Sequence, residues 1–195
     1  MLSSLADDGS IQWQTAEGLE SSGEDLSGLS VSDSSFSSCT FSSCTFDSAA
    51  FSSSVFEDCD FSSSSMEDIH ITSCLFLRCS FRGTMLTAAA VRGSSFSDCF
   101  MQYSSFSQAA VQKTVFSGCN LVEADFSDLK CRDLSLVSCR LERAAFMRTR
   151  LRDIDLASSD LTSLFISDNL AELRGARLDL DQWIQLAGLL QIRLR

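Results

Sequence analysis

Histidine is nearly absent from this sequence, as are several features that would assign it to a functional class. The chain has 195 residues and one histidine, His70. A single imidazole leaves almost no material for a histidine metal site or for Ser-His or Cys-His catalysis. No run of 18 apolar residues is present, so a transmembrane helix is not expected. Residues 1–14 lack the basic and apolar regions of a signal peptide, so we expect a cytoplasmic protein.

Basic residues are missing from the first part of the chain. No Lys or Arg precedes Arg78, and the formal net charge is −11. Such a balance disfavours a protein that binds nucleic acid through phosphate contacts. The asymmetry along the chain indicates an interaction surface more than a uniform solubilising coat.

A repeat of five residues determines the fold prediction. From Leu26 to Ile166 every fifth residue is apolar, most often Phe, and the frame never slips. The residue two places earlier is mostly Ser, Cys or Ala. A period of five fits neither a helix nor a flat strand, so the chain must turn once per repeat, as in a β-solenoid. A disordered Ser-rich tract is the alternative, but such tracts have few aromatic residues in strict phase.

The repeat unit resembles the pentapeptide-repeat family, whose motif is A(D/N)LXX. Residues 124–128 (ADFSD) and 159–163 (SDLTS) match it well. The resemblance implies an all-β fold, a right-handed quadrilateral β-helix with four pentapeptides per coil. We expect an N-terminal cap or imperfect first coil over 1–24, the β-helix over 25–168, and a C-terminal cap and dimerisation segment over 169–195.

Six cysteines support the four-sided coil independently, because they recur every 20 residues. Stacked coils would place these thiols parallel and about 4.8 Å apart, beyond the usual disulfide Cβ separation of roughly 3.5–4.5 Å. Parallel thiols also do not converge on a metal ion. We therefore expect reduced core thiols, no metal and no cofactor. The six are Cys39, Cys59, Cys79, Cys99, Cys119 and Cys139.

A regular rod of this kind has no pocket for catalysis, so we expect a protein that is not an enzyme and has no catalytic residues. His70 and Tyr103 fall at outward positions, and Tyr103 looks solitary. Phe100 and Phe165 are outward aromatics and therefore candidate contact residues.

The C-terminal residues leave the repeat. Residues 176–190 read as a short helix that Asp179 or Asp181 caps, and 191–195 as a short apolar strand. The simplest role is an intramolecular cap. Residues 175–182 (GARLDLDQ) also look like the end of Qnr and MfpA-type proteins, which implies a tail-to-tail homodimer. The dimerisation residues would be Leu178, Leu180, Trp183, Ile184, Leu186, Ala187, Leu190 and Ile192.

Charges sort onto different faces when the repeat is wound 20 residues per coil. The face of Val31 and Phe51 is net basic, whereas the face of Leu26 and Phe46 is the most acidic. We expect the acidic face and its neighbour to bind the partner. The residues are Asp25, Asp47, Glu67, Asp68, Asp125, Asp128 and Asp168 on the first, and Glu57, Asp58 and Asp98 on the second.

The resemblance and the charge together favour a DNA-mimicking protein. It would bind DNA gyrase or topoisomerase IV without contacting nucleic acid itself, and protect the enzyme from a quinolone or a natural toxin. No loop interrupts the repeat, so the likeness is nearer to MfpA-like proteins without loops. The alternative is a scaffold or interaction module with an unrelated partner.

Overall fold

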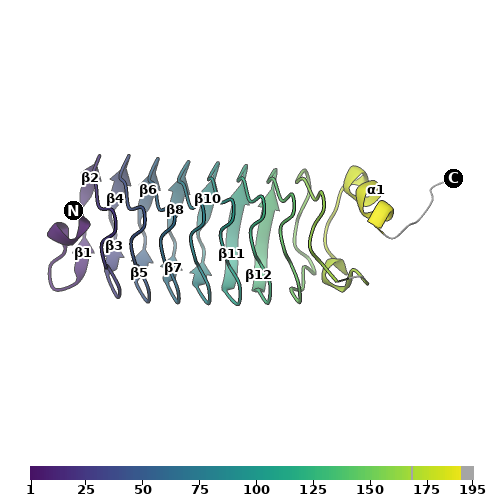
Figure 1. Ribbon diagram of the computed structural model, residues 1–195, viewed down its shortest axis with the longest axis horizontal. Helices are drawn as coiled ribbons and strands as arrows, with labels where there is room; N and C mark the ends of the chain where they lie inside the picture. Colours follow the sequence, from purple (N-terminus) through teal and green to yellow (C-terminus); the bar gives the residue numbers. More distant parts are fainter. Residues whose placement is uncertain (168, 190–195) are drawn as a thin grey trace.

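The computed structural model describes residues 1–167 and 169–189 as a rod, with the N-terminus at one end and the last helix at the other (Figure 1). Its strands are short and recur regularly along the rod, because each coil contributes only a few residues to each side. In chain order the elements are η1 (Leu2–Leu5), β1 (Ser10–Gln12), β2 (Thr15–Glu17), β3 (Ser30–Ser32), β4 (Ser35–Ser37), β5 (Ala50–Ser52), β6 (Val55–Glu57), β7 (His70–Thr72), β8 (Leu75–Leu77), β9 (Ala90–Arg92), β10 (Ser95–Ser97), β11 (Ala110–Ser117), β12 (Lys130–Val137), η2 (Ala171–Leu173) and α1 (Leu180–Leu189).

Strand pairing advances by one 20-residue coil at each step. Phe36 pairs with Phe56 and Phe56 with Phe76, and every strand pair is parallel. The ladder β1-β3-β5-β7-β9 forms the first side of the rod, and β2-β4-β6-β8-β10 forms the second. The longer β11 and β12 span both. The predicted β-helix is confirmed.

Single bridges replace strands on the other two sides. On the third side Thr40 bridges Asp60, and on the fourth side Thr45 bridges Ser65. Both bridges keep the 20-residue register of the strands. The coil therefore has four sides of five residues each, as the spacing of the cysteines predicted.

The core is a set of columns of stacked rings. Phe76 lies 5.0 Å from Phe56 and 4.7 Å from Phe96 between ring centroids, with nearly parallel planes. Rings on adjoining sides meet edge to face, as Phe76 and Phe81 do at 75°. Both arrangements are favourable for aromatic pairs, and they add to the hydrophobic gain of complete burial. One large side chain from each side of each coil therefore fills the interior of the rod.

The small inward position holds the predicted cysteine ladder. All six cysteines of the ladder are buried and none forms a disulfide. The Cys59 Sγ donates to the carbonyl oxygens of Phe36 and Glu57 at 3.5 and 3.4 Å, and the same pattern recurs one coil later at Cys79. Cysteine fits this position because it is small and apolar and has a weak donor for these carbonyls.

Backbone geometry explains why the chain has no proline. In successive repeats Ser38, Ser43 and Ser48 adopt left-handed φ angles of 50°, 56° and 56°. The N–H groups of Ser43 and Thr45 bond to carbonyls of the neighbouring coils at 2.9 Å. Proline has neither a positive φ nor an N–H, so it would break the stacking wherever these positions require them.

The N-terminal end keeps the register of the rod. Ile11 pairs with Val31 and Ala16 with Phe36, so residues 10–25 form a coil of the same pitch. The short helix η1 then places Leu2 against the core, with 3% of its surface exposed. The first coil is thereby shielded from water on its open face.

The C-terminal end is closed by α1, which begins later than expected. Arg177 still forms a β-bridge with Asp155, so the helix starts at Leu180 and not at residue 176. Asp179 is its cap: the Oδ1 accepts the N–H of Gln182, and the Gln182 Oε1 accepts the N–H of Asp179, both at 2.9 Å. The expected strand 191–195 lies outside the described residues.

Gln182 also fixes α1 to the rod. Its side chain is buried, and Nε2 donates to the carbonyl oxygens of Leu156 and Ser159 at 2.6 and 2.8 Å. One amide thereby binds two carbonyls of the last coil and covers part of its open edge; the Leu156 carbonyl also accepts the N–H of Ser159 at 3.1 Å. Among the described residues, no helix has the length and hydrophobicity needed to cross a membrane.

Glu172 completes this end of the rod from η2. The Oε1 accepts the N–H of Arg148 at 3.2 Å, and the Oε2 accepts the Oγ–H of Ser167 at 2.6 Å. Burial acts to raise the pKa of Glu172, but these hydrogen bonds outweigh it and hold the pKa below its usual value. The carboxylate therefore stays charged and serves as an acceptor for backbone groups that have no further coil to pair with.

Replacing an inward ring tests the register. Phe96→Ser removes a buried aromatic that stacks between Phe76 and Phe116 and leaves a hydroxyl facing the axis. We expect the free energy of unfolding to fall by about 3–5 kcal/mol in chemical denaturation. Cys99→Ala exchanges one small inward residue for another and is expected to cost about 1 kcal/mol or less. The reverse order would show that the register is wrong.

Replacing Gln182 tests the attachment of α1. Gln182→Leu removes both hydrogen bonds from the side chain to the last coil and leaves the Ser159 carbonyl without its donor, a local cost of about 1–3 kcal/mol. We expect faster amide hydrogen exchange in α1 and in the coil of Leu156, with the middle of the rod unchanged. Gln112→Leu, at an exposed position of β11, is the matched control. Equal rates of amide hydrogen exchange in the two variants would show that Gln182 does not attach α1 to the rod.

Candidate functional site

The outward positions of the rod form straight columns, because residues 20 apart lie on neighbouring coils. Asp47 and Glu67 belong to one column of the fourth side, and Asp58, Arg78 and Asp98 belong to one column of the second. The charge of each side is therefore determined by the residues of a few columns, and it differs from one side of the rod to the next.

The carboxylates of the fourth side are held by local hydrogen bonds. The Asp25 Oδ1 accepts the N–H and the Oγ–H of Ser27 at 3.1 and 2.6 Å, and these bonds hold the pKa of Asp25 below its usual value. The Asp47 Oδ1 accepts the N–H of Glu67 at 3.0 Å, and the Asp125 Oδ1 accepts the N–H two residues later at 2.9 Å. The bonds fix these carboxylates in position without neutralising their charge.

Arginines neutralise two other groups of expected partner-binding residues. Arg148 donates from Nε and a terminal nitrogen to the two carboxylate oxygens of Asp128 at 2.7 and 2.6 Å. Arg78 does the same to Asp58 at 2.8 Å and also reaches Glu57 at 2.5 Å. Hydrogen bonds from the arginines lower the pKa of Asp58 and Asp128. These three acids therefore present less net charge to a partner.

The remaining acids form the open part of the candidate site. Glu67 and Asp68 are exposed side by side on the fourth side, one coil from Asp47. Asp168, also expected here, lies outside the described residues. Within the described part of the chain, the expected acids that take part in no ion pair are Asp25, Asp47, Glu67, Asp68, Asp98 and Asp125.

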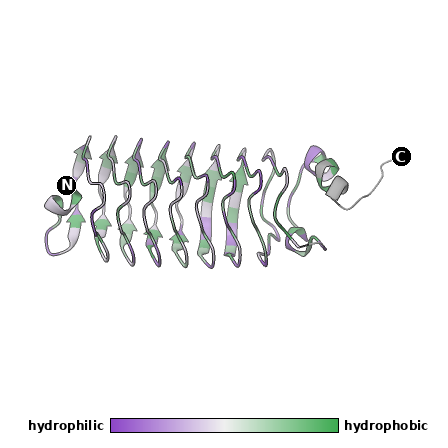
Figure 2. Ribbon diagram, viewed as in Figure 1, coloured by the Kyte–Doolittle hydropathy of each residue, from purple (hydrophilic) through white to green (hydrophobic). Residues whose placement is uncertain are grey.

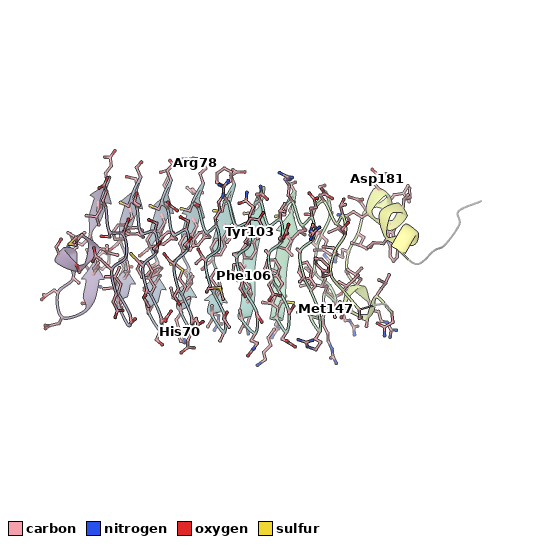
Figure 3. All side chains as sticks on the ribbon, in the orientation of Figure 1. His70, Arg78, Tyr103, Phe106, Met147 and Asp181 are labelled. Carbon is pink, nitrogen blue, oxygen red and sulfur yellow. The ribbon has the colours of Figure 1, made fainter. Side chains whose placement is uncertain are left out.

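The charge of the rod changes along its length. Residues 1–77 hold 13 carboxylates and no Lys or Arg. The first arginine, Arg78, projects from the upper edge of the rod in Figure 3. The negative charge is therefore concentrated in the N-terminal coils, although Arg78 reaches back to pair with Glu57 and Asp58 there.

The first side is basic toward the C-terminus. Lys113, Lys130, Arg132, Arg150 and Arg152 are exposed on it. The two arginines at 132 and 152 each approach the carboxylate of the following residue at 3.6 Å, with 81% of the arginine side chain exposed. Figure 2 shows the hydrophilic colour in the middle of β11 and β12. The rod thus has acidic and basic stripes, not a uniform coat.

Eight of the nine thiols are buried inside the rod, where a substrate does not reach them. Burial raises the pKa of Cys74 to about 11 and also raises the pKa of Cys44. A protonated, buried thiol is neither a nucleophile nor a metal ligand. The described residues contain no cluster of three or more His, Cys, Asp or Glu that could hold a metal ion.

The expected dimerisation residues divide into buried and exposed groups. Leu186 is 2% exposed and packs against the rod, whereas Leu180, Trp183 and Ile184 are 75%, 56% and 50% exposed. Leu178 is half-buried beside an apolar hollow of about 340 Å³ that Trp183 and Leu186 also line. Ala187 lies in α1, and Leu190 and Ile192 lie outside the described residues.

Tyr103 is not solitary, and here the expectation from the sequence is wrong. It lines a hollow on the third side with Arg82, Gln102, Asn120 and Arg140. These residues come from four successive coils, so no local stretch of sequence shows the cluster. The 20-residue register contained the signal, because it places Arg82 and Gln102 in one column beside the column of Tyr103.

Comparison with known proteins agrees with this architecture. Residues 69–146 match the family model described as a pentapeptide repeat region. No curated protein matches the sequence. Among solved structures, trypsin-treated QnrB1, a plasmid-mediated fluoroquinolone resistance protein, aligns with a TM-score of 0.64 at 19% identity, over 95% of this chain and 98% of that one.

A second trypsin-treated QnrB1 structure aligns with a TM-score of 0.50 at 17% identity, over 93% of this chain and 100% of that one. At 19% and 17% sequence identity, these alignments show a similar fold and no more. Residues 69–146 thus match a pentapeptide repeat region, and the strands and bridges on both sides of them continue in the same 20-residue register, so the β-helix has one architecture along its length.

Proposed function

We propose that the rod is a DNA mimic that occupies the DNA-binding surface of DNA gyrase or topoisomerase IV and so protects the enzyme from a quinolone or a natural toxin. The protein would act as a stoichiometric ligand. Its carboxylates take the place of phosphates on a basic partner surface, and no bond is made or broken.

The charge density of the N-terminal coils is the observation that carries this proposal. Residues 1–77 hold 13 carboxylates and no Lys or Arg. Spread over about four coils that rise about 4.8 Å each, this is one negative charge per roughly 1.4 Å of rod. Duplex DNA carries one per about 1.7 Å. Arg78 offsets part of this charge at Glu57 and Asp58, but the density stays of the same order as that of DNA, so a surface that attracts DNA would also attract this end of the rod.

The stiffness and length of the rod also support the proposal. Stacked rings and coil-to-coil hydrogen bonds leave little freedom to bend, so the charges are held in place before binding. A tail-to-tail pair would reach on the order of 80 Å, which matches about 20–25 base pairs of DNA.

Trypsin-treated QnrB1, a plasmid-mediated fluoroquinolone resistance protein, has a similar fold, and this likeness supports a quinolone as one agent that the protein would resist. The apolar frame runs without a slip from Leu26 to Ile166, so the likeness is to a rod without loops. The agent against which the protein protects gyrase is therefore either a quinolone or a natural gyrase toxin. The most direct experiment adds the protein to a gyrase supercoiling assay with and without each poison.

A scaffold with an unrelated partner is the second candidate. The basic stripe of the first side favours it, because a DNA mimic has no use for Lys113, Arg132 and Arg152. A protein that neither binds gyrase nor alters its inhibition in the supercoiling assay would leave this function in place of the first.

Neutralising part of the fourth side tests the mimicry. In the triple variant Asp47→Asn, Glu67→Gln and Asp68→Asn, the amide oxygen of residue 47 still accepts the N–H of residue 67, so the fold is retained. We expect gyrase binding about three- to tenfold weaker, mainly through slower association, with a shallower salt dependence. Surface plasmon resonance at several salt concentrations measures both.

The matched control for the triple variant changes the basic side. Arg92→Gln with Lys113→Gln removes charge at exposed positions of the first side. This variant is expected to bind gyrase equally or slightly more tightly, because it makes the rod more negative. Equal weakening in both variants, or a wild-type protein that does not compete with DNA for gyrase, would contradict the mimicry.

The proposed tail-to-tail dimer is tested at the exposed surface of α1. Trp183→Glu with Ile184→Glu places charges where two tails would meet, while buried Leu186 keeps α1 attached. We expect a dimer for the wild type and a monomer for the variant in light scattering, with the β-helical circular dichroism unchanged. Phe165→Ser, which removes an exposed aromatic outside the tail, is the control. A wild-type protein that is monomeric at micromolar concentration would contradict the proposed dimer.

A further inference from the structure

The third side of the rod carries a hollow that the proposed function does not use. It has a volume of about 350 Å³ and is lined by Arg82, Gln102, Tyr103, Asn120, Val122 and Arg140. In the coils that precede it, the corresponding columns hold mainly small polar residues, such as Ser42 and Ser62 in the column of Arg82. The serine coat of the rod is thus interrupted at one place by large side chains.

Exposed aromatic rings give this place the composition of a protein-binding hot spot. Tyr103 is 60% exposed, and the neighbouring Phe100 is 46% exposed. The Arg82 guanidinium lies 5.5 Å from the centroid of the Phe100 ring, and its Nε donates to the Gln102 Oε1 at 3.2 Å. Tyrosine and arginine are enriched in hot spots, and side chains held before binding lose less entropy when a partner docks.

The polar groups of the hollow are mostly hydrogen-bond donors. Arg82 and Arg140 contribute guanidinium groups. The Gln102 Oε1 accepts from Arg82, and the Asn120 Oδ1 accepts the N–H of Val122 at 3.3 Å, so the two amide NH₂ groups are left as donors among the described residues. No carboxylate lines the hollow. Such a surface complements a ligand that is rich in acceptors and negatively charged.

Acidic residues stand only at the rim. The Glu142 carboxylate is 3.8 Å from Arg140, and Glu123 lies 3.5 Å from Arg143. The contact at 3.8 Å joins side chains that are 61% and 41% exposed, so it is weak and leaves Arg140 able to bind another carboxylate.

The spacing of the two arginines limits the shape of the ligand. The backbone positions of Arg82 and Arg140 lie three coils apart, about 14 Å along the rod, and the Arg82 guanidinium leans toward the next coil, over Phe100. An extended peptide rises about 3.3 Å per residue, so side chains four residues apart lie about 13 Å apart and on the same face. The residue midway between them faces the rod as well, at the level of Tyr103 and Val122.

We propose that the third-side hollow binds an extended acidic segment of a partner protein, with two carboxylates four residues apart on Arg82 and Arg140 and an apolar side chain between them over Tyr103 and Val122. The amides of Gln102 and Asn120 donate to the main-chain carbonyls of the segment. This interface is separate from the acidic fourth side and does not depend on gyrase binding.

Two unique side chains make a selective NMR test possible. Tyr103 is the one tyrosine of the chain and lies in the hollow, and His70 is the one histidine. Figure 3 shows His70 at the lower edge of the rod, away from Tyr103. Ring-labelled tyrosine and histidine therefore report separately on the hollow and on a distant surface.

The probe is a nine-residue synthetic peptide with glutamate at its third and seventh positions and leucine at its fifth. We expect saturable shifts of the Tyr103 ring signals with no shift at His70. Arg82→Gln with Arg140→Gln should weaken the peptide affinity by about tenfold or more. Arg92→Gln with Lys113→Gln removes the same charge from the first side and should change the affinity by less than about twofold.

Three outcomes would overturn the proposal. They are no saturable Tyr103 shift at millimolar peptide, equal binding of a peptide with lysine in place of both glutamates, and equal weakening by the two arginine-containing double variants. Circular dichroism melting verifies that each variant is folded. The Arg82 and Arg140 variant should leave gyrase binding unchanged, so a failure of this proposal is distinguishable from a failure of the mimicry.

Discussion

The stacking of one large apolar side chain per side on its equivalent in the next coil is the interaction on which the rest of the molecule depends. Phe56, Phe76 and Phe96 lie directly above one another because the backbone of each coil bonds to the coils on either side. A slip of one residue in any coil would turn its rings to solvent and its polar residues to the axis. The register is therefore determined by burial, and the regular backbone follows from it.

This constraint also separates the core from the function. Two residues of each five face inward, and they are mainly phenylalanine, leucine, cysteine, serine and alanine. The three others face outward, where a change of side chain barely affects stability. An acidic stripe, a basic stripe and a donor-rich hollow therefore lie on one rod without conflict. Each side can serve a different partner, because the coils hold them at fixed angles to one another.

The ends of the rod obey a different constraint from its middle. A middle coil finds its hydrogen-bond partners in the two neighbouring coils, whereas an end coil has one neighbour only. At the C-terminus the polar side chains of Gln182 and Glu172 satisfy the groups left over, and α1 covers the apolar core. The same helix presents Trp183 and Ile184 to solvent, so one element that protects the rod also offers an apolar surface for a second copy.

A strict period and the burial of its apolar residues were enough to predict a coil and its inward positions from the amino-acid sequence. The four sides were implied by the resemblance to pentapeptide-repeat proteins, and the 20-residue spacing of the cysteines supported them and predicted the cysteine ladder. The sequence also predicted the formal charge on each side, which follows from counting positions, and it narrowed the helix cap to Asp179 or Asp181, between which the structure decided. It did not predict that Arg78 and Arg148 neutralise Glu57, Asp58 and Asp128, because an ion pair depends on side-chain reach as well as on register. It placed Tyr103 alone, although residues of the preceding coil and of the two following coils line the same hollow. These features needed the tertiary structure, since only the stacking of coils brings such distant residues within contact and decides which of them meet.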